Sequence, residues 1–333
     1  MNIQIKKIGI VGDGGWGTTL AIHLAKKKYP VMLWGPFQQY LRHVQKTRIN
    51  SKFLPGIPIP RTVKFTHNLQ DMVSYADLIV LATPSEYLPQ TLKKLKKLDV
   101  SQKIILSVTK GIDTKTLLRM SQVIHQELGK VHLAVLSGPT IASEVAKGIP
   151  STAVIASHNP KICKILQKIF NSPNFRIYTN SDVIGVELGG SLKNIIAIAS
   201  GVCDGLGYGT NTKAAILSRG LAEMARLGKA MGAQMETFYG LTGLGDLVTT
   251  CMSPSSRNRC VGEQLGRGRS IKKITSTMAM VAEGVPTVKA AYRLSRRYKV
   301  NMPITHEVYN IIYKNKNSLQ AVRDLMTRQI RAE

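Results

Sequence analysis

A glycine-rich segment near the start of the chain has the residue types and spacing of a phosphate-binding loop. Gly12-Asp13-Gly14-Gly15-Trp16-Gly17 fits the pattern G-x-G-x-x-G, directly after an apolar run at residues 8–11 and before an apolar helical stretch. Glycines in this pattern permit a tight turn, close approach of a pyrophosphate and close packing of helix against strand. The helix N-terminus also offers free N–H groups to the phosphates. The spacing alone is a weak signal, but its place in a first strand–helix unit predicts a dinucleotide site.

A lysine lies within an otherwise apolar predicted helix. Over residues 183–203 the only charged side chains are Glu187 and Lys193. Gly189 and Gly190 lie four and three positions before Lys193 on the same helical face, which leaves room for a ligand beside it. A desolvated lysine titrates lower than a free one, which suits it to proton transfer near neutral pH. The alternative is a lysine at the helix edge that extends to solvent, and the helical pattern favours neither.

A glycine-flanked carboxylate follows in the second half of the chain. Asp246 ends the run Gly243-Leu244-Gly245-Asp246, which lies in an uncharged stretch. It could pair with Lys193 and hold that side chain in place. The alternative is an aspartate in a turn that caps the next helix, which is a common arrangement.

A polar and basic run precedes another predicted helix, at residues 261–265. Ser255-Ser256-Arg257-Asn258-Arg259 combines hydroxyl, guanidinium and amide groups with a helix N-terminus. Together these groups would suit a phosphate. The alternative is an ordinary N-cap beside solvated arginines.

The pattern of apolar residues indicates the elements that position these groups. Short β-branched runs alternate with helical stretches up to about residue 179, and several runs are apolar throughout, as in parallel strands covered on both faces. Beyond that point the runs are long and helical. We therefore predict an α/β Rossmann-like N-terminal domain at residues 1–182 and a mostly helical C-terminal domain at residues 183–333. The predicted strands are residues 7–11, 31–34, 78–82, 103–108, 133–136, 152–156 and 175–178; the predicted helices include residues 116–128, 160–170, 183–203, 213–231, 286–298 and 319–330.

Composition narrows the class of protein further. The chain has 333 residues and four cysteines, none in a C-x-x-C pair or beside a histidine cluster, so we expect free thiols, no metal and a cytoplasmic location. No apolar run long enough to span a bilayer lacks a charge or glycine, and residues 1–12 do not resemble a signal peptide.

The charge is strongly basic. Lysine and arginine number 46 against 19 aspartates and glutamates, for a net charge of +27. Such a balance favours anionic partners and makes nucleic-acid binding a hypothesis. The sequence has no arginine-rich tail, no basic block with interleaved aromatics and no zinc-finger spacing. We therefore expect a solvated basic surface, with no nucleic acid as the main partner.

These motifs, taken together and in order, resemble the bacterial NAD(P)-dependent glycerol-3-phosphate dehydrogenase family over nearly the whole chain. The resemblance rests on six segments, and their combination is far more specific than any one of them. They are GDGGWGTTLA at 12–21, TKGI at 109–112, SGPT at 137–140, GVELGGSLKN at 185–194, GLGDL at 243–247 and SRNR at 256–259.

The resemblance implies an activity and roles for individual residues. The activity is hydride transfer between NAD(P)H and dihydroxyacetone phosphate, which would supply sn-glycerol 3-phosphate for phospholipid synthesis. Lys193 matches the general acid/base, Lys110 a second lysine that contacts substrate and cofactor, and Asp246 the carboxylate near Lys193. The remaining matches are Gly138, Thr140, Ser256, Arg257 and Asn258 at the substrate, and Gly12, Gly14, Gly15, Trp16, Gly17, Ala142, Val281 and Glu283 at the cofactor, with Arg257 also reaching the cofactor. A homodimer is a further expectation.

The chain departs from the family pattern at two places that bear on the cofactor. Relatives often carry a small residue at position 13 and serine or alanine at position 15, where this chain has Asp13 and Gly15. An aspartate near the pyrophosphate would weaken cofactor binding unless its side chain points away. The Gly35-Pro36 pair replaces family positions that often carry a basic or polar residue. The end of the second predicted strand also lacks the acidic residue that would bind an NAD ribose. The cofactor is therefore NADP or NAD, and the absent carboxylate favours acceptance of NADPH.

Other dehydrogenases with the same cofactor fold remain as alternatives. Enzymes acting on 3-hydroxyacids or 6-phosphogluconate also place a lysine on the first helix of the second domain. The segments at 109–111 and 256–259 favour a triose phosphate over those substrates. A binding protein for nucleic acid or membranes has no supporting motif in this sequence.

Overall fold

The computed structural model describes residues 4–278 and 280–330. The chain divides into two compact units, which we describe one at a time. Unit 1 comprises residues 1–110 and 118–186, and unit 2 comprises residues 111–117 and 187–333.

Unit 1 is built on a sheet of eight strands in the order β10-β9-β8-β7-β6-β1-β2-β5. β1 lies in the middle, parallel to both β2 and β6, with Ile10 opposite Leu33 and Val80. This order is that of a Rossmann fold, so the predicted class is confirmed. All seven predicted strands are present, with ends within two residues of those expected. The strands are β1 Ile8–Val11, β2 Val31–Trp34, β5 Lys64–Thr66, β6 Leu78–Leu81, β7 Ile104–Ser107, β8 His132–Ser137, β9 Ser151–Ala156 and β10 Phe175–Asn180.

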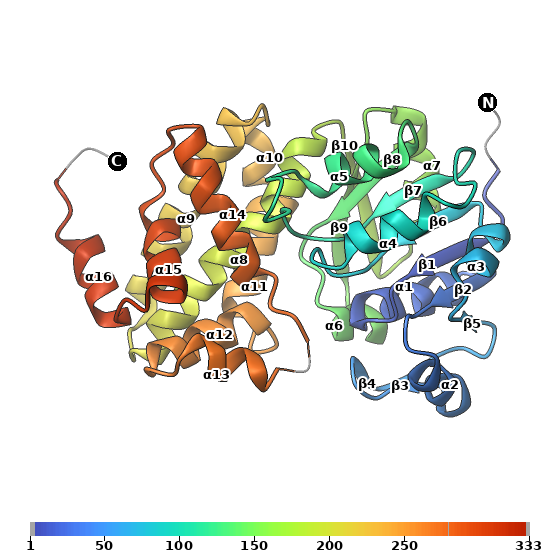
Figure 1. Cartoon of the computed structure of the whole chain (residues 1–333), viewed down its shortest axis with the longest axis horizontal. Coiled ribbons are helices and arrows are strands. Elements are labelled where there is room, and N and C mark those ends of the chain that lie inside the picture. The colour runs from blue at the N-terminus through green and yellow to red at the C-terminus, as the bar shows by residue number, and fades with distance from the viewer. Residues whose placement is uncertain (1–3, 279, 331–333) are drawn as a thin grey trace. The chain divides into compact units, whose positions relative to one another are not determined.

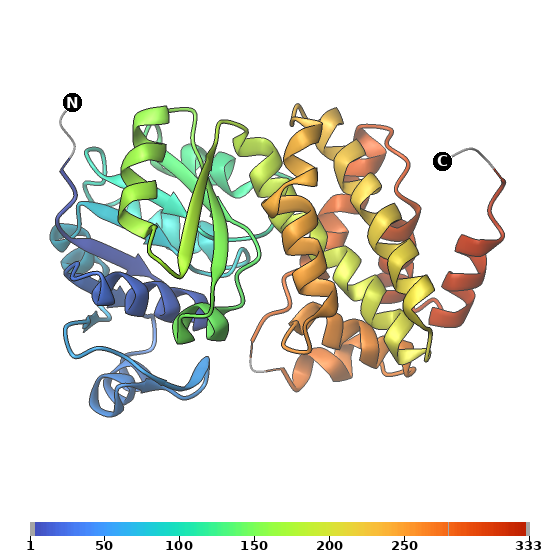
Figure 2. The same ribbon diagram turned by 180° about the vertical axis from the view of Figure 1, so that it is seen from behind.

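Helices cover both faces of this sheet (Figures 1 and 2). One apolar layer packs α1 and α7 against the strands, and the other packs α3, α4 and α5. The central strands β1 and β6 are covered on both sides and are apolar whichever way their side chains point, whereas the edge strands β5 and β10 expose polar side chains. The helices of unit 1 are α1 Gly15–Lys26, α2 Gln38–Thr47, α3 Leu69–Tyr75, α4 Leu88–Leu95, α5 Met120–Leu128, α6 Ala142–Lys147 and α7 Pro160–Phe170.

The direction of the last two strands differs from the parallel arrangement that the sequence suggested. β9 pairs antiparallel with β8, while β10 pairs parallel with β9. The connection from β8 contains α6, a helix of six residues, which spans about 9 Å. A six-residue strand such as β8 is about 20 Å long. A helix this short does not return the chain to the start of the strand, so β9 runs back beside β8.

A small second sheet was not predicted from the sequence, and one predicted helix begins later than expected. The short strands β3 Ile49–Asn50 and β4 Leu54–Pro58 form a separate antiparallel pair after α2. The predicted helix start at residue 116 is wrong: Asp113 Oδ1 accepts hydrogen bonds from the backbone N–H groups of Lys115 and Thr116, and Leu117 has a φ of 63°. This turn breaks the helical path, and α5 begins at Met120.

Unit 2 is helical, as predicted, and its central element is α8, Val183–Gly205, which begins in unit 1 (Figure 1). Every residue from 191 to 203 is buried, which explains why the helix is apolar on all sides. A Cβ on Gly201 or Gly262 would overlap backbone of the opposite helix, so α8 and α12 approach closely. The other elements are α9 Thr210–Ala230, α10 Met235–Tyr239, η1 Leu241–Gly245, α11 Asp246–Met252, α12 Arg257–Gly266, α13 Ile271–Ser276, α14 Gly284–Arg297, α15 Pro303–Lys314 and α16 Ser318–Met326.

The segment at residues 111–117 belongs to unit 2 because helices of that unit hold its backbone. Ser191 Oγ of α8 donates a hydrogen bond to the Gly111 carbonyl, 3.2 Å away. Arg293 of α14 donates one to the Thr114 carbonyl, 2.7 Å away. Nothing in the local sequence pattern of this segment indicated that placement.

By length and composition, α8 is the one helix in the described part of the chain that could cross a membrane. Inside the protein, 94% of its most apolar window is buried. Such burial is what the core helix of a folded domain shows.

Candidate active site

The glycine-rich segment forms the turn from β1 into α1. Gly12 has a φ of 124°, and a Cβ there would lie 2.8 Å from the Ala82 carbonyl carbon, so only glycine fits. A Cβ on Gly17 would overlap the Gly12 carbonyl oxygen, which shows how closely the helix packs on the loop. Gly14 differs from both, because a Cβ there would meet nothing within 4 Å. The middle glycine therefore leaves an open approach to the backbone.

The N-terminus of α1 is exposed to that open space. Gly14 is the N-cap, and it has no side chain with which to cap the first N–H groups of the helix. The first turn of α1 contains no acidic residue. Uncapped N–H groups and the positive end of the helix dipole together favour a phosphate. The loop thus fits the pyrophosphate of a dinucleotide.

Asp13 does not point into this opening. Its side chain is buried against Gly35, the residue that follows β2, and a Cβ on Gly35 would overlap the Asp13 carboxylate. The backbone of Asp13 is held by Asn50, whose Nδ2 donates to the Asp13 carbonyl at 2.8 Å. Burial raises the pKa of the Asp13 carboxyl above its ordinary value, partly offset by the nearby Lys52 ammonium. The carboxylate is thus directed towards the end of β2.

Trp16 and Ala142 lie beside the loop. Thr19 Oγ1 of α1 donates to the Ala142 carbonyl at 3.0 Å. The Trp16 ring meets Phe175 edge to face, with 6.4 Å between the ring centroids. Among the described residues, Trp16 Nε1 has no hydrogen-bond partner. The structure therefore brings both predicted cofactor residues to the glycine loop.

Lys110, Gly138 and Thr140 converge on one carbonyl group in unit 1. Lys110 Nζ donates to the Gly138 carbonyl at 3.0 Å, and Thr140 Oγ1 donates to the same oxygen at 3.1 Å. Gly138 has a φ of 140°, and a Cβ there would lie 3.0 Å from Ala153 Cα. The turn after β8 therefore needs glycine, and it fixes the position of the lysine ammonium.

Lys193 forms a buried ion pair with Asp246 inside unit 2. Lys193 Nζ lies 2.9 Å from Asp246 Oδ1, and the two side chains are 8% and 3% exposed. Thr250 joins them, accepting a hydrogen bond from Lys193 Nζ at 2.5 Å and donating one to Asp246 Oδ1 at 3.2 Å. Of the two readings of Lys193, the lysine that extends to solvent is excluded.

A π-helix sets the position of Asp246. η1, Leu241–Gly245, contains the motif glycines and leads directly into α11, whose first residue is Asp246. A Cβ on Gly243 would overlap the Phe238 carbonyl, and one on Gly189 of α8 would lie 2.6 Å from the Thr242 carbonyl oxygen. These glycines allow the wide turn to pack against α8. Asp246 is the first residue of α11, and its carboxylate faces Lys193.

The residue after Lys193 connects α8 to the polar run at residues 255–259. Asn194 Oδ1 accepts a hydrogen bond from Asn258 Nδ2 at 2.8 Å, and Asn258 Oδ1 accepts one from the Gly284 N–H at 2.9 Å. Asn258 is buried. Consecutive residues of α8 thus hold Asp246 of α11 and Asn258 of α12, so the motifs at 185–194, 243–247 and 256–259 meet within unit 2.

The other residues of the polar run have separate partners. Ser256 is the N-cap of α12, with its side chain accepting from the Arg259 N–H at 3.2 Å. Arg259 pairs with Asp204 at 2.7 Å. Arg257 is exposed, and its Nη1 donates to the Val281 carbonyl at 2.5 Å, near the half-buried Glu283. The plain N-cap is therefore present, while Arg257 lies at the surface where it could bind a phosphate.

Two residues at this site were missed by the sequence reasoning. Thr250 follows Asp246 by one helical turn, a spacing that places it on the same face of α11. Asn194 belongs to the matched segment 185–194, but its sequence gives no sign of the contact with Asn258. Both are polar residues buried among apolar ones. The sequence did not indicate that these two side chains are buried.

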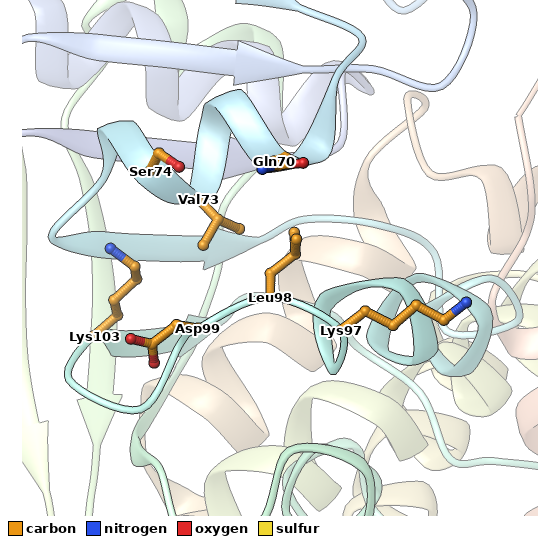
Figure 3. Close-up of a pocket in the computed structure, with 7 residues that line it drawn as sticks. All are labelled: Gln70, Val73, Ser74, Lys97, Leu98, Asp99 and Lys103. Carbon is orange, nitrogen blue, oxygen red and sulfur yellow. The ribbon is translucent and has the colours of Figure 1, made fainter.

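The described residues include no metal site, and unit 1 has a polar cavity away from the glycine loop. Among the described residues, no group of three or more histidine, cysteine, aspartate or glutamate side chains could hold a metal ion. A polar cavity of about 400 Å³ lies in unit 1 between α3 and residues 97–103, with Asp99 and Lys103 in its wall (Figure 3). This segment precedes β7, so the cavity lies at the amino end of that strand, whereas the glycine loop follows the carboxyl end of the parallel strand β1.

Comparison with known proteins shows which family the chain is similar to. Residues 7–163 match the family described as NAD-dependent glycerol-3-phosphate dehydrogenase N-terminus, and residues 182–323 match its C-terminus. The chain is 46% identical to the glycerol-3-phosphate dehydrogenase (NAD(P)+) of Geobacter sulfurreducens, over 98% of this chain and 99% of that protein. The crystal structure of the glycerol-3-phosphate dehydrogenase of Coxiella burnetii is similar, with a TM-score of 0.94 and 38% identity, covering 97% of this chain and 99% of that one.

Proposed function

Because the chain belongs to the NAD-dependent glycerol-3-phosphate dehydrogenase family, we propose that it interconverts dihydroxyacetone phosphate and sn-glycerol 3-phosphate, with NAD(H) or NADP(H) as cofactor. The glycine loop and the uncapped N-terminus of α1 would hold the cofactor's pyrophosphate. When bound, the nicotinamide supplies or accepts the hydride at C2 of the substrate. The product, sn-glycerol 3-phosphate, would feed phospholipid synthesis.

The buried pair of Lys193 and Asp246 is the observation that supports this chemistry most directly. During reduction of the ketone, negative charge develops on the C2 oxygen, and a proton must reach that atom. Lys193 Nζ can stabilise the charge and donate the proton, becoming a neutral amine that is reprotonated from solvent. Asp246 and Thr250 fix the direction of Nζ.

The second lysine would stabilise the same developing charge. Lys110 Nζ has three protons, and one of them is directed at the Gly138 carbonyl. We propose that this bond positions the ammonium so that it contacts both the substrate and the cofactor. Gly138 and Thr140 then belong to the substrate loop through their hold on Lys110.

The substrate's phosphate would bind at the N-terminus of α12. Arg257 is exposed there, at the first position of the helix, and Asn258 lies next to it. A guanidinium beside a helix N-terminus is a strong site for a phosphate dianion. Asn258 supports this site through its bonds to Asn194 and Gly284. Arg257 donates a hydrogen bond to the Val281 carbonyl, and we propose that Arg257, Val281 and Glu283 also take part in binding the cofactor.

We also propose a cytoplasmic location and a homodimer. All four cysteines are free thiols, and Cys163, Cys203 and Cys251 are buried, which suits a reducing compartment. Cell fractionation tests the location, and sedimentation velocity tests the oligomeric state.

A spectrophotometric assay tests the activity itself. Purified protein with dihydroxyacetone phosphate should oxidise NADH or NADPH, measured as loss of absorbance at the reduced nicotinamide band. Unphosphorylated dihydroxyacetone is the control and should be a far poorer substrate. No oxidation by folded protein that binds the cofactor would contradict the proposed substrate. Activity on a 3-hydroxyacid or on 6-phosphogluconate would identify that compound as the substrate in place of dihydroxyacetone phosphate.

A further inference from the structure

The position of Asp13 supplies a carboxylate where β2 itself has none. Strand β2 ends at Trp34, and the next residues, Gly35 and Pro36, have no acidic side chain. β1 and β2 are neighbours in register, and the Gly12 N–H donates to the Trp34 carbonyl at 3.0 Å. This bond brings Asp13, the next residue along, against Gly35.

Asp13 and Gly35 fit each other closely. A Cβ on Gly35 would overlap the Asp13 carboxylate and lie 3.1 Å from Asp13 Cβ. Any larger residue at position 35 would therefore displace the carboxylate. Gly35 stands at the end of β2 in place of an acidic residue. Because it has no side chain, it also leaves space for the carboxylate of Asp13 from the loop.

One oxygen of this carboxylate lacks a donor. Asp13 is 7% exposed, and its Oδ2 has no hydrogen-bond partner among residues 4–278 and 280–330. A buried carboxylate oxygen without a donor is costly, so a ligand that brings a hydroxyl to it would be favoured. In Rossmann folds the end of the second strand is where an acidic residue binds the hydroxyls of the adenosine ribose.

We propose that Asp13 takes the role of the missing acidic residue of β2, accepts hydrogen bonds from the adenosine ribose hydroxyls, and so makes the protein prefer NAD(H) over NADP(H). This inference rests on the proposed function and concerns the same cofactor. A 2′-phosphate would remove the hydroxyl that donates to Asp13 and would bring a second negative charge beside a buried carboxylate. On this proposal Asp13 would repel a 2′-phosphate, whereas the sequence alone indicated no carboxylate that would do so.

The cation that faces Asp13 is Lys52, which is exposed. Its ammonium lies 5.1 Å from the Phe53 ring centroid. Solvent screens an exposed cation strongly, and a buried carboxylate much less. The repulsion of a 2′-phosphate by Asp13 therefore outweighs its attraction to Lys52.

Direct binding measurements test this assignment without relying on catalysis. The chain has two tryptophans, Trp16 in the loop and Trp34 at the end of β2, so quenching of their fluorescence reports on bound cofactor. NADH and NADPH are titrated separately into wild-type protein and into Asp13→Asn, which keeps the side-chain size and removes the charge. Calorimetry with NAD+ and NADP+ provides a second readout. Wild type should bind NADH at least about tenfold more tightly than NADPH, which is the range of a hydrogen bond to a charged group.

Two further variants complete the experiment. Asp99→Asn makes the same change in net charge in the separate cavity of Figure 3, where Asp99 accepts only local bonds from Ser101, and it should leave both affinities unchanged. Gly35→Ala should displace the Asp13 carboxylate and weaken NADH binding while position 13 keeps its aspartate.

The outcomes separate this inference from the proposed function. Asp13→Asn should lower the ratio of the NADPH to the NADH dissociation constant by about tenfold or more, with the melting temperature close to that of wild type. A wild-type protein that binds NADPH as tightly as NADH, or a ratio that Asp13→Asn leaves unchanged, would overturn the inference and leave the function standing. Binding of neither cofactor would overturn both.

Discussion

Lys193 and Asp246 form an ion pair of 2.9 Å in the helical unit, with both side chains almost fully buried. Moving two charges out of water costs free energy, and the attraction between the two charges offsets that cost only partly. A buried pair of this kind is weak support for stability. Its position where three sequence motifs meet fits the role in the reaction that we propose for it.

Replacement of Lys193 by alanine should abolish most of the turnover. Proton donation and charge stabilisation at C2 are lost together, and we expect kcat to fall by about 10³-fold or more. Steady-state kinetics with dihydroxyacetone phosphate measures the effect, and retained quenching by cofactor shows that the protein is folded. Lys213→Ala is the matched control, since Lys213 also pairs with an aspartate, Asp204, at 2.6 Å in the same unit. If Lys193→Ala keeps substantial activity, its role as the acid/base is refuted.

A double-mutant cycle should distinguish the effect of the ion pair on stability from its effect on turnover. Lys193→Met leaves the Asp246 carboxylate buried without its cation, and Asp246→Asn leaves the ammonium without its anion, so each single change should cost about 3 kcal/mol or more. The double variant leaves neither charge, and its cost should be well below the sum. Urea unfolding measures these free energies. Turnover should stay lost in the double variant. A loss in the free energy of unfolding of the double variant equal to the sum of the two single losses would contradict the coupling.

Arg257→Ala should act on substrate affinity. Loss of a charge-assisted bond to the phosphate predicts a KM for dihydroxyacetone phosphate about tenfold to hundredfold higher, with kcat within a few-fold of wild type. The matched control is Arg267→Ala, at the other end of α12, where Arg267 pairs with Glu263 and is 60% exposed. A KM that both variants leave unchanged would place the phosphate elsewhere.

Two glycines of the loop should respond differently to the same substitution. Gly14→Ala adds a methyl group to open space at a φ of −67°, which alanine adopts easily, so the fold should keep its melting temperature. The methyl would obstruct the approach of the pyrophosphate, and cofactor affinity should fall by at least about tenfold. Gly17→Ala would overlap the Gly12 carbonyl oxygen and should lower both stability and affinity. Thermal melts and fluorescence titrations distinguish the two, and normal cofactor binding by Gly14→Ala would refute the assigned opening.

Sequence periodicity predicts the layers of this fold well and its strand directions less well. β8 and β9 each contain a run of consecutive apolar residues, which made them recognisable as strands. That same uniformity gives no information about direction, which here depends on the short helix α6. β5, with three residues, and the pair β3–β4 are too short to give a periodic signal.

The candidate site divides in the same way. The loop at 12–17 depends on local geometry and could be identified from spacing and glycine content, whereas Gly138 was indicated only by the resemblance to the family. The contact between Asp13 and Gly35 could not, because it is produced by the pairing of β1 with β2. The same holds for Thr250 and Asn194, whose partners lie on other helices.

His23 should make unit 1 sensitive to acid. Its Nε2 donates to the Phe170 carbonyl at 2.7 Å, and its ring meets Phe175 edge to face at 5.2 Å. Burial, with the nearby Lys26 and Lys27, lowers the pKa of His23 to about 4 from an ordinary 6.5. The folded state therefore favours the neutral ring: this stabilisation is complete above pH 6.5 and is lost as the pH falls towards 4, amounting to about 3 kcal/mol.

The corresponding experiment compares wild type with His23→Gln, which keeps a donor for the Phe170 carbonyl but does not titrate. Carboxylates elsewhere also titrate in this range, and the comparison removes their contribution because both proteins share them. Free energies of unfolding in urea should fall more steeply for wild type than for His23→Gln between pH 6.5 and 4.5. Above pH 7 wild type should be the more stable of the two, because only its ring packs against Phe175. Parallel pH profiles would show that His23 is protonated in the folded protein as readily as in the unfolded chain.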